Sequence, residues 1–120
     1  DDLAMAVVVQ RMVEPDAAGV LFTVDPVQRR RDRMIVEAVR GRGEQVVSGE
    51  VTPDHYVVDR SGARKRERLV ADGVLSDDEL ARLAALGTRL EEHFGRPQDV
   101  EWAIADGEIY LLQSRPVTTL

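Results

Sequence analysis

The last twenty residues of the chain contain two apolar segments that a tight turn separates. The turn is the dipeptide Asp106-Gly107, and the flanking segments are rich in Val, Ile, Trp, Tyr and Leu. These residue types favour strands, and Asp-Gly is a strong hairpin signal because such turns need residues that adopt positive φ angles. The sequence therefore predicts an antiparallel β-hairpin at this end of the chain.

The predicted hairpin carries polar groups suited to a metal and a polyphosphate. Glu101 lies on the first strand, and Gln113 and Arg115 follow twelve and fourteen residues later. Magnesium takes oxygen ligands, which a carboxylate and an amide supply, and a guanidinium can make a bidentate contact with phosphate. We expect Glu101 and Gln113 to bind the metal, both of them with Arg115 to bind the polyphosphate, and Arg115 to be the catalytic cation that offsets charge as a phosphoryl group departs.

The length of the hairpin loop decides whether these side chains meet. A two-residue loop would pair Ala105 with Glu108 and place Glu101 on the face opposite Gln113 and Arg115. A three-residue loop would place all three on one face, with Gly107 near a left-handed conformation. The expected chemistry therefore predicts a three-residue loop, with Leu111 as the floor of the site. The alternative is an ion pair between Glu101 and Arg115 on an edge strand.

Bulk properties limit the class of protein. The chain has 120 residues, 43% hydrophobic and 32% charged, which fits one small globular domain. A net charge of −6 argues against a nucleic-acid-binding surface, and no apolar run has the length of a membrane span. We expect a soluble, cytoplasmic protein. Because the chain begins Asp-Asp without Met, we also expect a piece of something longer.

Short strands are expected along the first half of the chain. Apolar, β-branched runs separated by turn residues predict strands at 3–13, 19–24, 33–38 and 55–58. A short helical turn is expected at 44–48. Short strands with tight connections favour a largely antiparallel sheet. The polar segment 59–72 is interpreted as a loop or an irregular pair of strands.

A helix is predicted at about residues 76–95. Ser76 and Glu79 form a capping-box pattern, in which each side chain satisfies a free backbone N–H of the other, and Gly95 and Pro97 mark the end. Its apolar face recurs every three to four residues and packs on the sheet. That face consists of Leu80, Leu83, Ala84, Gly87, Leu90 and Phe94. The predicted fold class is α+β.

The amino-acid sequences of several segments resemble those of one family of enzymes. Asp-Val-Glu-Trp at 99–102, followed by an apolar strand that ends in Gln-Ser-Arg-Pro at 113–116, is similar to the end of the nucleotide-binding domain of phosphoenolpyruvate synthase, pyruvate phosphate dikinase and rifamycin phosphotransferase. That domain has the ATP-grasp fold. The run Val7–Val13 resembles the strand against which adenine lies, and Gln10 matches a nucleotide-contacting position.

Two further segments resemble the family with differences. In Gly19–Pro26 the resemblance implies a strand and a loop near the nucleotide. Thr23 and Asp25 either shape a turn there, which is the favoured interpretation, or contact the ligand. Glu37–Glu44 corresponds to a segment that usually reads Gly-Leu-Gly-Glu. Here Arg42 replaces the Leu, and Arg40 stands where an apolar or aromatic residue is common.

The resemblance implies that residues 1–120 are a single partial domain, the C-terminal lobe of an ATP-grasp domain that binds ATP and Mg²⁺. The preceding lobe, which brings a Lys and an Arg to the phosphates, and the phosphohistidine carrier domain have no counterpart in this sequence. The parent would phosphorylate a carrier histidine and then pyruvate, or, alternatively, a rifamycin hydroxyl. The chain alone is expected to be inactive.

Two interpretations from other classes remain open. Arg40 and Arg42 are consistent with a degenerate, non-catalytic nucleotide-binding or structural module. The arginine-rich segment Arg29–Arg33 could instead form a protein-interaction surface, which would bind less tightly as salt increases.

Overall fold

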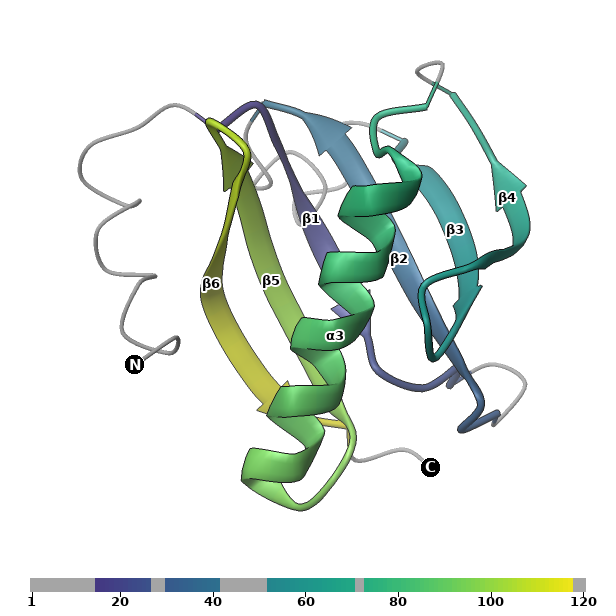
Figure 1. Cartoon of the computed structure of the whole chain (residues 1–120), viewed down its shortest axis with the longest axis vertical. Helices are drawn as coiled ribbons and strands as arrows, with labels where there is room; N and C mark the ends of the chain where they lie inside the picture. The colour runs from purple at the N-terminus through teal and green to yellow at the C-terminus, as the bar shows by residue number, and fades with distance from the viewer. Residues whose placement is uncertain (1–14, 27–29, 42–51, 71–72, 118–120) are drawn as a thin grey trace.

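The computed structural model describes residues 15–26, 30–41, 52–70 and 73–117. Within this part of the chain a six-stranded sheet carries a long helix against one of its faces (Figure 1). The order of the strands is β4-β3-β2-β1-β5-β6, and every neighbouring pair is antiparallel. The elements are β1 (Ala17–Phe22), β2 (Arg33–Arg40), β3 (Asp54–Asp59), β4 (Arg64–Arg68), α3 (Asp77–Phe94), β5 (Gln98–Ala105) and β6 (Glu108–Pro116).

This architecture confirms the predicted α+β class, with its antiparallel sheet, long packed helix and C-terminal hairpin, and it is consistent with an ATP-grasp lobe. Three predicted strands lie within one to two residues of β1, β2 and β3. The segment 59–72, for which a loop or strand pair was expected, contains the edge strand β4. The expected strand at 3–13 and helical turn at 44–48 lie outside the described residues.

The caps of α3 agree with the sequence pattern. Ser76 Oγ accepts a hydrogen bond from the Glu79 backbone N–H at 3.1 Å, and the Glu79 carboxylate accepts one from the Ser76 N–H at 2.9 Å. Gly95 ends the helix in a left-handed conformation, with φ of 75°. Its N–H donates to the carbonyl of Glu91 at 2.7 Å. Local hydrogen bonds therefore fix both ends of the helix.

The predicted apolar face of α3 is correct except at its last residue. Leu80, Leu83, Ala84, Gly87 and Leu90 are buried against the sheet. Phe94 is instead 47% exposed and packs edge-on against His93, with the ring centroids 4.7 Å apart. Phe94 is the last residue of the helix, directly before the left-handed Gly95, and four residues beyond the last buried position.

The core lies between α3 and the sheet face that it covers. Tyr56 and Trp102 are the largest fully buried side chains, and aliphatic residues from β1, β2, β3 and β5 fill the rest. The Tyr56 hydroxyl accepts a hydrogen bond from the Leu75 N–H at 3.1 Å, and burial raises the pKa of this phenol. Because side chains alternate along each strand, the residues between the core positions lie on the other face of the sheet, here called the distal face.

A buried network joins β1, α3 and the start of β5. The Thr23 hydroxyl donates to the Glu91 carboxylate at 2.7 Å and accepts from the Gln98 N–H at 2.9 Å. Arg60 donates to the Thr23 carbonyl at 2.7 Å and also contacts Glu91. Thr23 is fully buried, so its conformation and its position relative to α3 are fixed by these bonds.

A buried carboxylate organises the connection between β4 and α3. Asp54, at the first position of β3, is 1% exposed. It accepts hydrogen bonds from the N–H groups of Val70, Gly73 and Val74 at 2.6, 3.1 and 2.9 Å.

No helix among the described residues is long and apolar enough to cross a membrane.

Candidate functional site

The hairpin of β5 and β6 has a two-residue loop, so the prediction of a three-residue loop is wrong. Ala105 pairs with Glu108, and only Asp106 and Gly107 lie between the strands. Their φ angles are 51° and 77°, which is the pair of positive values that a type I′ turn needs. Asp-Gly favours this turn strongly, and the local preference of the backbone determined the loop.

A β-bulge nevertheless brings the predicted side chains together. From the turn, the pairing is regular up to Trp102 and Leu111, and it then shifts by one residue. Beyond the shift, Glu101 pairs with Gln113 and Asp99 pairs with Arg115, so Leu112 is the extra residue of the bulge. Such an insertion changes which face the following side chains occupy.

The same bulge places Leu111 on the face covered by α3, and the expectation that it forms the floor of the site is wrong. Leu111 is opposite Trp102 and belongs to the buried core. The physical reason is that both side chains are apolar, and burying them in the core beneath α3 is more favourable than exposing them on the distal face. The shift in register occurs just after this pair, where polar residues begin to alternate with apolar ones.

Glu101 and Gln113 are therefore direct cross-strand neighbours on the distal face. Directly opposed residues have Cβ atoms roughly 5 Å apart, within reach of one shared ligand. Glu101 is partly buried and Gln113 is exposed. Among the described residues, no hydrogen bond or ion pair engages either side chain.

Arg115 lies beside this pair and forms an ion pair with Asp99. The Arg115 Nη2 and Asp99 Oδ2 atoms are 3.5 Å apart, with the Arg side chain 61% exposed and the Asp side chain 25% exposed. The alternative interpretation from sequence paired Arg115 with Glu101. In the described part of the chain, the ion-pair partner of Arg115 is Asp99 and not Glu101.

Polar contacts next to the hairpin lock its open end. Gln98 is 1% exposed, and its Oε1 accepts a hydrogen bond from the Ser114 hydroxyl at 2.7 Å. The Gln98 amide nitrogen donates to the Arg96 carbonyl at 3.1 Å. These bonds join β5 to β6 one residue away from Asp99 and Arg115, so they hold the ion pair in register.

Further polar residues continue the row across the distal face. Glu101 pairs with Val20 of β1, Val20 pairs with Glu37 of β2, and Glu37 pairs with His55 of β3. The His55 Nδ1 and Glu37 Oε2 atoms are 3.1 Å apart. The sheet therefore aligns Gln113, Glu101, Glu37 and His55 in one row, which is here called the polar row.

The other residues that the sequence placed near the nucleotide, Gln10, Thr23 and Asp25, do not lie on the hairpin. Gln10 lies outside the described residues. Thr23 is fully buried, and its hydroxyl bonds to Glu91 and to the Gln98 N–H in the network described above. Asp25 pairs through its backbone with Arg30, with N···O distances of 2.9 and 3.0 Å, and so closes the loop after β1.

The arginine-rich segment is partly engaged in its own ion pair. Arg30 makes a two-bond contact with Asp32, with distances of 2.8 and 3.1 Å. This contact lowers the pKa of the exposed Asp32 carboxyl. One of the positive charges proposed for a protein-interaction surface is thus already neutralised within the chain.

The donor set suits a metal that takes few ligands from the protein. Among the described residues no group of three or more His, Cys, Asp or Glu side chains could hold a metal ion. Magnesium is usually bound by one or two protein oxygens together with phosphate oxygens and water. The carboxylate of Glu101 and the amide oxygen of Gln113, directly opposed across the ladder, are of this kind.

Comparison with known proteins identifies the same family that the sequence of the hairpin resembles. Residues 1–73 and 62–120 match the family described as the pyruvate phosphate dikinase, AMP/ATP-binding domain. The chain belongs to this family. The family is described as an AMP/ATP-binding domain, and the hairpin of this dikinase-family lobe carries the candidate site described above.

Similar proteins of this dikinase-family lobe include phosphoenolpyruvate synthases and rifampicin phosphotransferases. The chain is 43% identical to a probable phosphoenolpyruvate synthase of Methanocaldococcus jannaschii, over 98% of this chain and 12% of that protein. It is 46% identical to one of Methanothermobacter thermautotrophicus, over 97% of the chain and 20% of the relative. It is 45% identical to a rifampicin phosphotransferase of a Streptomyces species, over 97% of the chain and 16% of the relative. The chain spans about a fifth or less of these relatives.

Sequence reasoning missed two features of the site in this dikinase-family lobe. Asp99 could have been found, because it precedes Glu101 by two residues just as Arg115 follows Gln113 by two. The pairing of Glu37 with His55 had no local signal. These two residues lie 18 positions apart and meet only because β2 and β3 are neighbours in the sheet.

Proposed function

We propose that this chain is the ATP- and Mg²⁺-binding lobe of a dikinase-type phosphotransferase. Family membership supports an AMP/ATP-binding role. The observation that carries the proposal is the direct opposition of Glu101 and Gln113, with Arg115 two residues away on the same face of the same strand. A carboxylate, an amide and a guanidinium arranged in this way match the chemistry of a metal-bound polyphosphate.

Each side chain has a distinct task in this proposal. Glu101 and Gln113 would hold Mg²⁺ and contact ATP, and the metal when bound would neutralise charge on the phosphate oxygens. Arg115 would donate hydrogen bonds to the phosphoryl group that is transferred and offset the charge that develops there. Asp99, whose carboxylate is 3.5 Å from the Arg115 guanidinium, would position that side chain before the nucleotide binds.

The proposal places the remaining parts of the reaction in a longer protein. Gln10 would contact the nucleotide from the segment that precedes β1. Residues 1–120 would form a single partial domain, and the other lobe and a phosphohistidine carrier domain would belong to the same cytoplasmic enzyme. That enzyme would phosphorylate the carrier histidine and then pyruvate. The lobe by itself would not turn over.

A rifamycin hydroxyl is the second candidate acceptor. The identity to the rifampicin phosphotransferase of a Streptomyces species, 45%, lies between the 43% and 46% of the two phosphoenolpyruvate synthases. Acceptor choice lies outside this lobe in the proposed arrangement, so the parent enzyme has to be assayed with both acceptors. Phosphorylation of pyruvate but not of a rifamycin would support the leading proposal.

The proposal is tested by removing one charge from the hairpin of the parent enzyme. Glu101→Gln keeps the shape of the side chain and removes its charge. Glu108→Gln is the matched control, because it makes the same change on the same hairpin, opposite Ala105 and away from the predicted site. Binding of a non-hydrolysable ATP analogue is measured by calorimetry with and without Mg²⁺.

We expect Glu101→Gln to weaken Mg²⁺-dependent binding by about 10- to 100-fold, since a bond to a charged group contributes roughly 1.5–3 kcal/mol. Glu108→Gln should bind as the unmodified protein does. Equal binding by all three proteins would contradict the proposal. Absence of binding in the unmodified parent would favour the degenerate module suggested by Arg40 and Arg42.

A further inference from the structure

The strand β4 forms one edge of the sheet, and its outer side has no neighbouring strand in the described part of the chain (Figure 1). Such an edge presents backbone N–H and C=O groups with which a further strand can pair. Residues 65–70, which comprise most of β4 and the two residues after it, are all exposed. This edge of the sheet is therefore open to a partner.

The charge of β4 is strongly one-sided. Four of its five residues are cationic, although the whole chain has a net charge of −6. Two of the four cations are engaged by carboxylates of the chain itself. Arg64 lies 2.7 Å from Asp77, and Lys65 lies 3.6 Å from Asp59. The other two cations are available to a partner.

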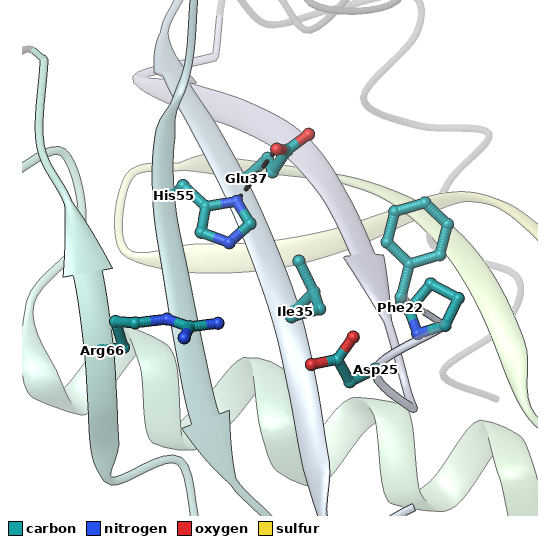
Figure 2. Close-up of a pocket in the computed structure, with 7 residues that line it drawn as sticks. Phe22, Asp25, Ile35, Glu37, His55 and Arg66 are labelled. Carbon is teal, nitrogen blue, oxygen red and sulfur yellow. Dashed lines mark hydrogen bonds and ion pairs between the residues drawn. The ribbon is translucent and has the colours of Figure 1, made fainter. Parts of the chain in front are cut away.

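Arg66 and Arg68 are these two cations, and neither forms an ion pair with another described residue. They lie opposite Val57 and His55 in the ladder with β3, so both belong to the distal face. Figure 2 shows Arg66 reaching from β4 across β3 on that face, where it lines a pocket of about 280 Å³. Their backbones are roughly 7 Å apart, which is the spacing of alternate residues on a neighbouring strand.

Two exposed apolar residues continue this surface beyond the end of β4. Leu69 and Val70 are 41% and 58% exposed, and they are two of the three large apolar side chains that the described residues expose. The backbone of Val70 is held in place, because its N–H donates to the buried Asp54 carboxylate at 2.6 Å. An apolar side chain on an already ordered backbone can pack against a partner with little further loss of entropy.

The arginines select against one kind of partner and favour another. If β4 paired with β4 of a second copy, arginines would face arginines, and like charges that oppose each other across a ladder are destabilising. Short, cationic edges protect a sheet from self-association in this way. The same charges attract a strand that carries carboxylates. The longer parent proposed above offers such a strand outside residues 1–120.

We propose that an acidic, extended segment from another part of the parent pairs with β4 as an additional strand of the sheet. Carboxylates at alternate positions of this segment contact Arg66 and Arg68, and an apolar residue packs on Leu69 and Val70. Backbone hydrogen bonds along the edge supply affinity, and the side chains supply selectivity. The proposal takes from the proposed function only that the chain belongs to a longer protein, and it does not depend on ATP binding.

The first test links the segment covalently to β4 in the parent. Arg68→Lys keeps the charge and places a primary amine on the distal face, and a carbodiimide couples this amine to a carboxylate in contact with it. Mass spectrometry of the digested monomer identifies that carboxylate. Arg96→Lys is the matched control, because Arg96 is exposed in the turn before β5, four positions from β4 in the sheet.

We expect position 68 to cross-link to an acidic segment outside residues 1–120, and position 96 not to reach that segment. Cross-links from position 68 only to residues within 1–120, or to a second copy of the protein, would overturn the proposal.

Hydrogen exchange of the β4 amides in the parent is an independent measurement. Arg68→Glu should speed their exchange by at least about tenfold, because the reversed charge repels the acidic segment and opens the edge. Arg96→Glu makes the same change in charge and should leave the exchange unaltered. Raising the salt from about 0.1 M to about 1 M should also speed the exchange in the unmodified parent, since the contact is exposed. Amides of β2 report whether the sheet stays folded.

Equal exchange of the β4 amides in the unmodified parent and in Arg68→Glu would overturn the proposal. Binding of the ATP analogue is measured on the same proteins, so that the two proposals are judged separately. An unmodified parent that cross-links at position 68 in its Arg68→Lys form but does not bind the analogue would overturn the ATP-binding proposal and leave the docking strand standing.

Discussion

Glu101 on β5 lies directly opposite Gln113 on β6, and Leu112 is the bulged residue that makes this pairing possible. The type I′ turn at Asp106-Gly107 pairs Ala105 with Glu108. If the ladder continued from there without a bulge, Leu112 would lie opposite Glu101. The extra residue moves Gln113 and Arg115 by one position and so keeps them on the distal face. The geometry of the candidate site thus depends on a backbone irregularity as much as on its side chains.

Deletion of Leu112 should preserve the site. Without this residue the two-residue turn would pair Glu101 with Gln113 and Asp99 with Arg115 in a regular ladder, as they pair now. We expect the affinity of the parent for the Mg²⁺-bound ATP analogue to change by less than about tenfold, equivalent to about 1.4 kcal/mol. Calorimetric titration measures this directly.

Deletion of Ser114 is the matched comparison, because it also removes one residue from β6. In that variant either Gln113 or Arg115 must face the core, whichever register forms. Binding should therefore fall by more than about tenfold, and stability should fall because a polar group is buried. If the two deletions weakened binding equally, the register argument would be wrong.

Asp99→Asn should affect the site more than the fold. The ion pair with Arg115 is largely exposed and contributes at most about 1 kcal/mol to stability. Loss of the charge releases the guanidinium, so we expect slower single-turnover phosphoryl transfer in the parent with nearly unchanged urea unfolding. Asp78→Asn, which removes the exposed pair with Arg82 on α3, should change neither property.

Thr23→Val should destabilise the lobe. The substitution removes the hydroxyl that donates to Glu91 and accepts from the Gln98 N–H in a fully buried position. Leaving these partners unsatisfied should lower the free energy of unfolding by about 1–3 kcal/mol in urea denaturation. Thr88→Val is the control, because its hydroxyl makes only a 3.5 Å contact with Arg60. A similar loss in both variants would argue against the network.

Stability should decrease in acid through Asp59, at the turn between β3 and β4. Hydrogen bonds from Ser61 and Ala63, led by the Ser61 hydroxyl, lower the pKa of the Asp59 carboxyl from 3.8 to about 2. Because the folded pKa is depressed, this stabilisation is complete above pH 3.8 and is lost as the pH falls to about 2.

The variant Asp59→Asn isolates this effect. The difference in unfolding free energy between the unmodified protein and Asp59→Asn should shrink as the pH is lowered across that window. Urea unfolding at several pH values measures it. A difference that stays constant down to pH 2 would show that the turn does not depend on the ionised carboxylate.

The sequence by itself determined the local elements. Ser76 and Glu79 cap α3 because both partners lie within one turn, and the helix ends at Gly95 because glycine adopts the left-handed conformation at little cost. The turn at Asp106-Gly107 also follows from local preference, and the site chemistry that suggested a longer loop had no influence on it. Interactions and backbone preferences of residues close in sequence are sufficient to determine these caps and this turn.

Only the tertiary structure decided where the register of the hairpin shifts. Alternation predicts which residues share a face, but the shift falls after Trp102 and Leu111 because α3 covers that pair and keeps it in the core. The same dependence on neighbours across the sheet applies to Glu37 and His55, and to Thr23 and Glu91, which are 68 positions apart. These contacts form between distant segments, so no local pattern in the sequence specifies them.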